Sequence, residues 1–116
     1  PMQHGIADML NKYPDHPTEL PQFYQQKRDA FTSAMKNTRF KLLPCSGTYF
    51  QLADYSEISD LNEYDFCHWL TETAGVAAIP ISSFYQTPIE GQRIVRFCFA
   101  KSTETLEQVG HLLSAV

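Results

Sequence analysis

The most informative side chain in the sequence is Arg96, because it lies inside an apolar run from Ile94 to Phe99 that is typical of a β-strand. Side chains alternate along a strand, so Ile94 and Cys98 share a face with Arg96, and we expect both faces to be buried. A guanidinium does not deprotonate, and an isolated buried charge is strongly unfavourable. We therefore expect Arg96 to contact an anion.

Two sources of that anion are compatible with the sequence. One of the thirteen Asp and Glu residues would make Arg96 part of a structural ion pair. Alternatively, a ligand carboxylate would bind the planar guanidinium through two parallel hydrogen bonds, each worth about 1.5–3 kcal/mol when charge-assisted. Lysine offers no such fork and would not replace Arg96 well. Arg93, at the start of the same strand, is expected to be solvated.

Other chemistry-bearing residue types show no defined pattern, and we assign no catalytic residue. The histidines have no metal-ligand spacing, so no metal site is expected; they are His4, His16, His68 and His111. The cysteines form no Cys-x-x-Cys pair and are interpreted as small buried hydrophobes; they are Cys45, Cys67 and Cys98. The stretch from Pro44 to Thr48 is typical of a turn rather than of a phosphate-binding loop.

The composition is that of an ordinary globular domain. The chain has 116 residues, of which 43% are hydrophobic and 19% charged, and this length allows one domain but not two. The net charge of −4 has the wrong sign for a nucleic-acid partner. The longest uncharged apolar stretch, 76–81, is too short for a membrane helix. We expect a soluble, cytoplasmic protein that binds neither nucleic acid nor membrane.

Two helices are predicted in the first third of the chain. Apolar residues recur at helical spacing over residues 2–13, and the prolines within 14–17 interrupt the pattern. The pattern resumes over 19–37, with Thr18 as the expected N-cap. Helical spacing begins at the first residues with no leading tail, which we interpret as a sign that the chain was cut from a longer one; the alternative is removal of an initiator methionine before Pro1.

Two more helices are predicted in the second half. Residues 60–74 form the third, in which Asp60 and Glu63 make a capping-box-like start and Gly75 provides a left-handed stop. Ser102 is the expected cap of the last helix, whose leucines recur at core spacing.

Short runs rich in β-branched and aromatic residues predict four strands, the first two of which form a hairpin; the runs are 40–43, 48–53, 76–79 (ended by Pro80) and 93–100. The predicted order is helix, helix, strand, strand, helix, strand, strand, helix. The fold class is therefore α+β: residues 1–116 form one domain whose helices cover one face of a small antiparallel or mixed sheet.

Three motifs, taken together in this order and at these separations, resemble the C-terminal third of class I/II, fold-type I pyridoxal-phosphate aminotransferases. They are Gly47-Thr48-Tyr49-Phe50, Gly75-Val76-Ala77-Ala78-Ile79-Pro80 and Arg96-Phe97-Cys98-Phe99-Ala100-Lys101. Similar runs occur in the methionine and kynurenine aminotransferase-like enzymes. The likeness extends over almost the whole chain.

The resemblance implies that the chain is the small domain, which packs against a large cofactor domain and closes over the bound amino acid. Residues 1–16 would be the end of the large domain or a linking helix. Arg96 matches the arginine that binds the substrate α-carboxylate, and Phe84 and Tyr85 lie in the segment near the active-site entrance. The full-length enzyme would be a pyridoxal-phosphate-dependent homodimer that transfers an amino group from methionine, aromatic amino acids or kynurenine to a 2-oxo acid.

The sequence also departs from the complete family pattern. The lysines lie on predicted helices or near strand ends, and none of them is expected to be the Schiff-base lysine, which together with the other cofactor-binding residues is expected upstream of this chain. We therefore expect this chain alone to bind no cofactor and to be inactive. The alternative is a stand-alone α+β binding or interaction module, in which Arg96 is a structural ion pair. A domain separated from its partner should expose apolar side chains around Met2, Ile6 and residues 79–85.

Overall fold

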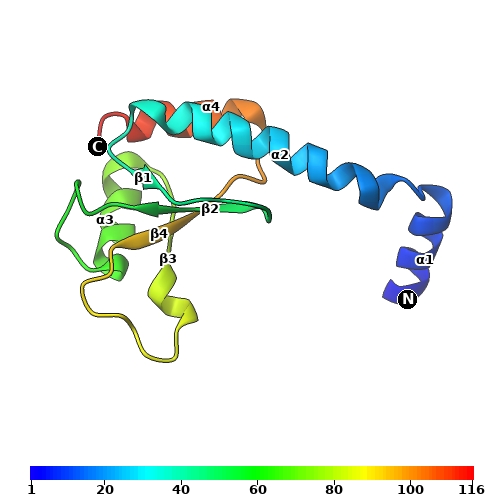
Figure 1. Ribbon diagram of the computed structural model, residues 1–116, viewed down its shortest axis with the longest axis horizontal. Helices are drawn as coiled ribbons and strands as arrows, with labels where there is room; N and C mark the ends of the chain where they lie inside the picture. The colour runs from blue at the N-terminus through cyan, green and yellow to red at the C-terminus, as the bar shows by residue number, and fades with distance from the viewer.

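The computed structural model describes residues 1–116 and has the predicted order of elements (Figure 1). The helices are α1 (Met2–Lys12), α2 (His16–Ala34), α3 (Glu63–Ala74) and α4 (Thr103–Leu113), with short 3-10 turns η1 (Met35–Asn37) and η2 (Ile81–Phe84). The strands are β1 (Lys41–Leu42), β2 (Phe50–Asp54), β3 (Ile79–Pro80) and β4 (Ile94–Cys98).

The four strands form one antiparallel sheet in the order β1-β2-β4-β3. The pairing of β1 with β2 confirms the predicted hairpin. Arg96 lies at the centre of β4, where it pairs with Leu52 of β2 on one side and with Ile79 of β3 on the other. A central strand position fixes the backbone of Arg96 on both sides.

The helices cover one face of this sheet, which confirms the α+β prediction. Helices α2 and α4 lie side by side along the sheet (Figure 1). Phe97 of β4 lies below them, with its ring 5.8 Å from that of Phe31 in α2 and 5.4 Å from that of Phe40. Phe66 of α3 joins the same buried cluster. The core therefore lies between this sheet face and the three helices α2, α3 and α4.

The opposite face of β4 is only partly covered, so the prediction that both faces are buried is wrong. Val95 and Phe97 are buried, whereas Ile94 and Arg96 are half-buried and Cys98 is exposed. The interpretation of all three cysteines as buried is correct for Cys67 alone, because Cys45 is half-buried. The alternation along β4 was predicted correctly, but no helix covers the second face.

Helix α3 begins later than predicted. Asn62, not Asp60, is the N-cap, and its side chain accepts a hydrogen bond from the Asp65 N–H. Glu63 does not reach back to close a capping box; it is buried in the protein. Gly75 ends the helix at φ 68°, as predicted, in a conformation that glycine adopts without a Cβ penalty.

Two other boundaries differ from the prediction: the start of α2 and the extent of β3. Helix α2 starts at His16 with Asp15 at the N-cap position, and the Thr18 hydroxyl donates to the Asp15 carbonyl instead of capping. Residues 76–78 are not in a strand; β3 consists of Ile79 and Pro80 only, with Pro80 as its last residue. Strand β3 is at the edge of the sheet, where the missing N–H of proline costs no ladder hydrogen bond.

Apolar side chains are exposed at both places where we expected them. Helix α1 has no buried residue and projects from the end of α2, with Met2 79% and Ile6 51% exposed (Figure 1). Phe84 is 56% and Tyr85 41% exposed. Figure 1 shows that these are two separate surfaces rather than one. No helix is long and apolar enough to cross a membrane.

The free energy of unfolding is expected to fall at alkaline pH because the buried Tyr55 phenol and Cys67 thiol release their protons less readily in the folded protein than in the unfolded chain. The Tyr55 hydroxyl donates to the Leu61 carbonyl at 2.9 Å, and burial raises the pKa of this phenol. Burial, with a smaller contribution from the charge of Glu63, raises the pKa of the Cys67 thiol to about 11. The unfolded chain releases these protons at lower pH than the folded chain does, so unfolding becomes more favourable as the pH rises above the ordinary thiol value of 9.0.

The melting temperature, followed by circular dichroism, should therefore fall between about pH 8 and about pH 10.5. The variant Cys67→Ala should show a shallower fall. An equal slope for Cys67→Ala and the wild type would show that the thiol does not contribute.

Candidate functional site

Arg96 lies on the partly covered face of the sheet between two aromatic rings. Its guanidinium carbon is 4.6 Å from the ring centroid of Phe50 in β2 and 4.8 Å from that of Phe84 in η2. Contacts of this kind are worth about 0.5–2 kcal/mol each and hold the flat group in a defined orientation. The structure thus places Phe84 beside Arg96. Both are among the three site residues predicted from the sequence.

Arg96 has no partner of opposite charge within the chain. The ion pairs in the structure involve Arg28 with Asp29, Lys41 with Glu57, and Arg93 with Asp60. The Nε of Arg96 is buried and makes no hydrogen bond. The alternative in which Arg96 is a structural ion pair is therefore wrong. Arg93 is partly exposed, as expected, and forms a surface ion pair with Asp60 at 3.2 Å.

Tyr85 and Phe50 differ from what the sequence indicated. Tyr85 follows Phe84 on the surface, where its backbone N–H donates to the Ser82 carbonyl. The place of Tyr85 at the site beside Arg96 stays a prediction. Phe50 was missed, although it belongs to the predicted strand 48–53. Only the register, in which Phe50 pairs with Cys98, places it next to Arg96.

Glu63 is a second residue that sequence reasoning placed incorrectly. It is 4% exposed, and its carboxylate accepts three hydrogen bonds, from the backbone N–H of Ser82 at 2.7 Å, the backbone N–H of Ile94 at 3.0 Å and the side chain of Gln92 at 3.1 Å. These donors satisfy a buried negative charge without a cation. Glu63 therefore connects the start of α3 to the segments that carry Phe84 and Arg96.

A cavity of about 340 Å³ lies beside β4, and Arg96, Cys98 and Lys101 are among its lining residues. No acid lines this cavity. The other four lysines lie elsewhere: Lys12 and Lys27 contact the aromatic rings of Tyr13 and Phe23, Lys41 pairs with Glu57, and Lys36 is exposed in η1. Pyridoxal phosphate needs a lysine and a partner for its pyridine nitrogen. This cavity holds Lys101 but no acid for the pyridine nitrogen, and the expectation that the chain alone binds no cofactor stays a prediction.

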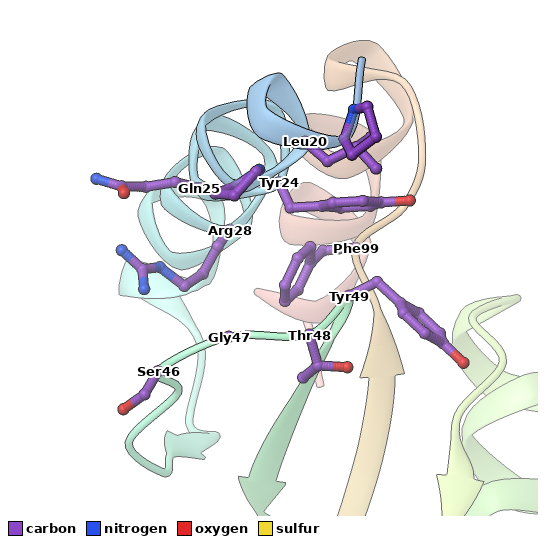
Figure 2. A pocket seen from close by; sticks show the side chains of 11 residues that line it. Leu20, Tyr24, Gln25, Arg28, Ser46, Gly47, Thr48, Tyr49 and Phe99 are labelled. Carbon is purple, nitrogen blue, oxygen red and sulfur yellow. The ribbon is translucent and has the colours of Figure 1, made fainter. Parts of the chain in front are cut away.

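The largest groove, of about 450 Å³, is separate from Arg96 and lies between α2 and residues 46–49. Figure 2 shows Tyr24 and Phe99 along its inner wall, with the side chain of Arg28 directed outward. Thr48 on its floor has φ 63°, an unusual conformation for a β-branched residue. This groove brings Gly47, Thr48 and Tyr49 against helix α2, whereas Phe50, the last residue of the same motif, contacts Arg96.

One family of enzymes matches this sequence over nearly its whole length. The sequence profile of the family "Aminotransferase class I and II" matches residues 1–115. The chain belongs to this family.

Individual relatives are similar over almost the whole chain. The methionine aminotransferase of Escherichia coli K12 is 49% identical over 106 residues, which are 91% of this chain and 27% of the relative. The human kynurenine–oxoglutarate transaminase 3 is 31% identical over 133 residues, which are 99% of this chain and 29% of the relative. This chain thus spans less than a third of the length of either relative.

Solved structures show the same fold. The crystal structure of YbdL from Escherichia coli, described as having a methionine aminotransferase function, superposes with a TM-score of 0.89 at 46% identity and covers 96% of this chain and 29% of the other. The N-succinyldiaminopimelate aminotransferase of Mycobacterium tuberculosis gives a TM-score of 0.86 at 30% identity, covering 99% of this chain and 30% of the other.

Proposed function

We propose that the chain is the C-terminal small domain of a longer pyridoxal-phosphate-dependent aminotransferase, and that Arg96 binds the α-carboxylate of the substrate. The observation that carries this proposal is the guanidinium of Arg96, which is half-buried, has no acid of its own and lies between two aromatic rings. The share of each relative that this chain spans supports the proposal that more of the enzyme exists outside it.

The geometry favours a carboxylate over other anions. The guanidinium carbon of Arg96 lies 4.6 Å from the ring centroid of Phe50 and 4.8 Å from that of Phe84, so the two rings occupy part of the space around the group. The N–H donors of a guanidinium lie in its plane, and a carboxylate accepts two parallel hydrogen bonds from such an edge. Packing against the rings restricts the side chain, and this lowers the entropy lost on binding.

Amino-group transfer suits a single carboxylate-binding arginine. The amino-acid donor and the 2-oxo-acid acceptor both carry a carboxylate next to the reacting carbon, so one guanidinium can orient both. The names of the relatives support methionine and kynurenine as donors, and we extend the proposal to aromatic amino acids. The cofactor and its lysine would belong to the large domain, with which the exposed Phe84, Tyr85 and α1 surfaces would pack, and the full-length enzyme would be a homodimer.

The decisive experiment compares free acids with esters in the intact polypeptide. L-Methionine, L-phenylalanine and L-kynurenine are assayed for amino-group transfer to a 2-oxo acid, each beside its methyl ester. We expect transfer from the free acids and a kcat/KM more than about 100-fold lower for the esters, which lack the anion that Arg96 binds. Equal rates for acids and esters would exclude the assigned role of Arg96, and no transfer from any donor would exclude the aminotransferase.

The reading frame offers a second, simpler test. An aminotransferase requires the frame to continue upstream for more than twice the length of this chain, given the share of the relatives that the chain spans. It also requires a lysine in a Ser-x-x-Lys context within that upstream part. An initiator codon directly before Pro1 would favour the stand-alone module instead.

A further inference from the structure

Glu63 connects the two segments that form the site around Arg96. Its Oε2 accepts from the N–H of Ser82, two residues before Phe84, and its Oε1 accepts from the N–H of Ile94, two residues before Arg96. We infer that Glu63 is a positioning residue: it holds Phe84 over the guanidinium of Arg96 and thereby sets the affinity for the substrate carboxylate. This inference rests on the proposed function of Arg96.

The burial of Glu63 supports a specific positioning role. Glu63 and Gln51 are the two buried polar side chains of the chain, and Glu63 is the one that carries a formal charge. A buried carboxylate is retained at a high desolvation cost, which the three hydrogen bonds to Ser82, Gln92 and Ile94 offset. An apolar side chain at this position would fill the space, but it could not hold two backbone segments in register.

The residue after Glu63 adds a second connection to the same turn. The Tyr64 hydroxyl lies 2.9 Å from the Ser83 hydroxyl. Successive residues of α3 thus contact successive residues of η2, Ser82 and Ser83, and the next residue of η2 is Phe84. The position of the ring over Arg96 therefore depends on the start of α3.

The two backbone hydrogen bonds to Glu63 also lie at the two ends of the surface loop that joins η2 to β4. Every residue from Tyr85 to Gly91 is exposed, whereas Ser82 and Ile94, at the two ends, are half-buried and bonded to the same carboxylate. The loop is therefore anchored at both ends by one side chain. Loss of that carboxylate would release the segment that carries Phe84, while β4 stays paired with β2 and β3, and the guanidinium would lose one of its two aromatic neighbours.

The test substitutes Glu63→Gln in the intact protein and uses Glu72→Gln as the matched control, because Glu72 is an exposed acid on the same helix. Glutamine keeps the size of the side chain but has one acceptor oxygen, so one of the two hydrogen bonds from the backbone N–H groups of Ser82 and Ile94 is lost. We expect KM for the amino acid and for the oxo acid to rise about tenfold, with kcat changed less than KM. Glu72→Gln should leave both constants as in the wild type.

A double-mutant cycle shows whether Glu63 acts through Arg96. In the Arg96→Ala background, Glu63→Gln should change kcat/KM less than about twofold, because the group that it positions is gone. An equal loss in both backgrounds would overturn the inference while leaving the proposed function intact. If Arg96→Ala alone leaves kcat/KM unchanged, the proposed function fails first, whatever Glu63 does.

A surface variant and a measurement on the wild type cover the case in which Glu63→Gln does not fold. Tyr64→Phe removes only the hydroxyl contact with Ser83, and it should raise KM about two- to threefold in the wild type but not in the Arg96→Ala background. Amide hydrogen exchange should be slower at Ser82 and Ile94 than across 85–91. An unchanged KM for Tyr64→Phe, or exchange at Ser82 and Ile94 as fast as in the loop, would contradict the positioning role.

Discussion

Arg96→Ala is expected to lower kcat/KM of the intact protein by more than about 100-fold for amino-acid and 2-oxo-acid substrates alike. The substitution removes the planar donor group that would bind the carboxylate in both half-reactions. The loss should be found mainly in KM, because a group that binds substrate and transition state through the same carboxylate contributes uniform binding. Initial rates over a range of each substrate measure this directly.

Arg96→Lys distinguishes the charge from the geometry of the group. Lysine keeps the positive charge but has no fork to bind a carboxylate at two points and no flat face to lie between Phe50 and Phe84. We expect Arg96→Lys to raise KM strongly for both substrates, with a smaller effect than Arg96→Ala. Arg93→Lys is the matched control, since Arg93 precedes the same strand and its ion pair with Asp60 tolerates lysine. An unchanged KM in Arg96→Lys would refute carboxylate binding by a fork.

The part of this site that could be predicted from the sequence is the part that depends on local patterns. Arg96 stood out because a charged residue in an apolar strand needs an explanation, and strand alternation placed it opposite Val95 and Phe97. Both of these are buried, as that alternation requires. The order of helices and strands likewise followed from periodicities of three to four residues and of two, which neighbouring residues determine.

The errors concern partners that are distant in the sequence. Glu63 resembles a capping residue when only its neighbours are considered, but its hydrogen-bond partners lie 19 and 31 residues further along the chain. Phe50 lies beside Arg96 only through the pairing register of β2 with β4. Pro80 is accommodated in a strand because that strand is at an edge of the sheet. None of these relations has a signal within a window of ten residues.

The exposure of Cys98 shows why burial is harder to predict than strand position. An apolar run on both faces of a strand is typical of a sheet covered on both sides, and in this chain helices cover only one. The second face carries Arg96 and its aromatic neighbours. In the proposed enzyme this face would be covered by the substrate and the large domain, so the apolar run would reflect the assembled protein rather than this chain alone.

Gly110→Val is expected to destabilise the fold by about 3 kcal/mol, because helices α2 and α4 cross at this glycine. A Cβ added at Gly110 would lie 2.5 Å from the backbone oxygen of Ala34 and 2.7 Å from its Cβ, closer than carbon and oxygen atoms pack in proteins. The obstacle is backbone, which cannot move aside as a flexible side chain can. The two helices would have to separate, and the contacts that cover the sheet would be lost.

Gly110→Ala tests the same contact with the smallest possible addition, and Gly5→Ala is its matched control. Alanine favours a helix over glycine by about 1 kcal/mol, so both substitutions gain in helix propensity. Gly5 in α1 has no atom within 4 Å of an added Cβ, and Gly5→Ala should not lower stability. Gly110→Ala should lower it by about 1–3 kcal/mol in urea unfolding despite the gain in propensity. Equal stability of the two variants would show that α2 and α4 do not pack as closely as the structure has them, and that the core beneath Phe31 and Phe97 does not depend on this crossing.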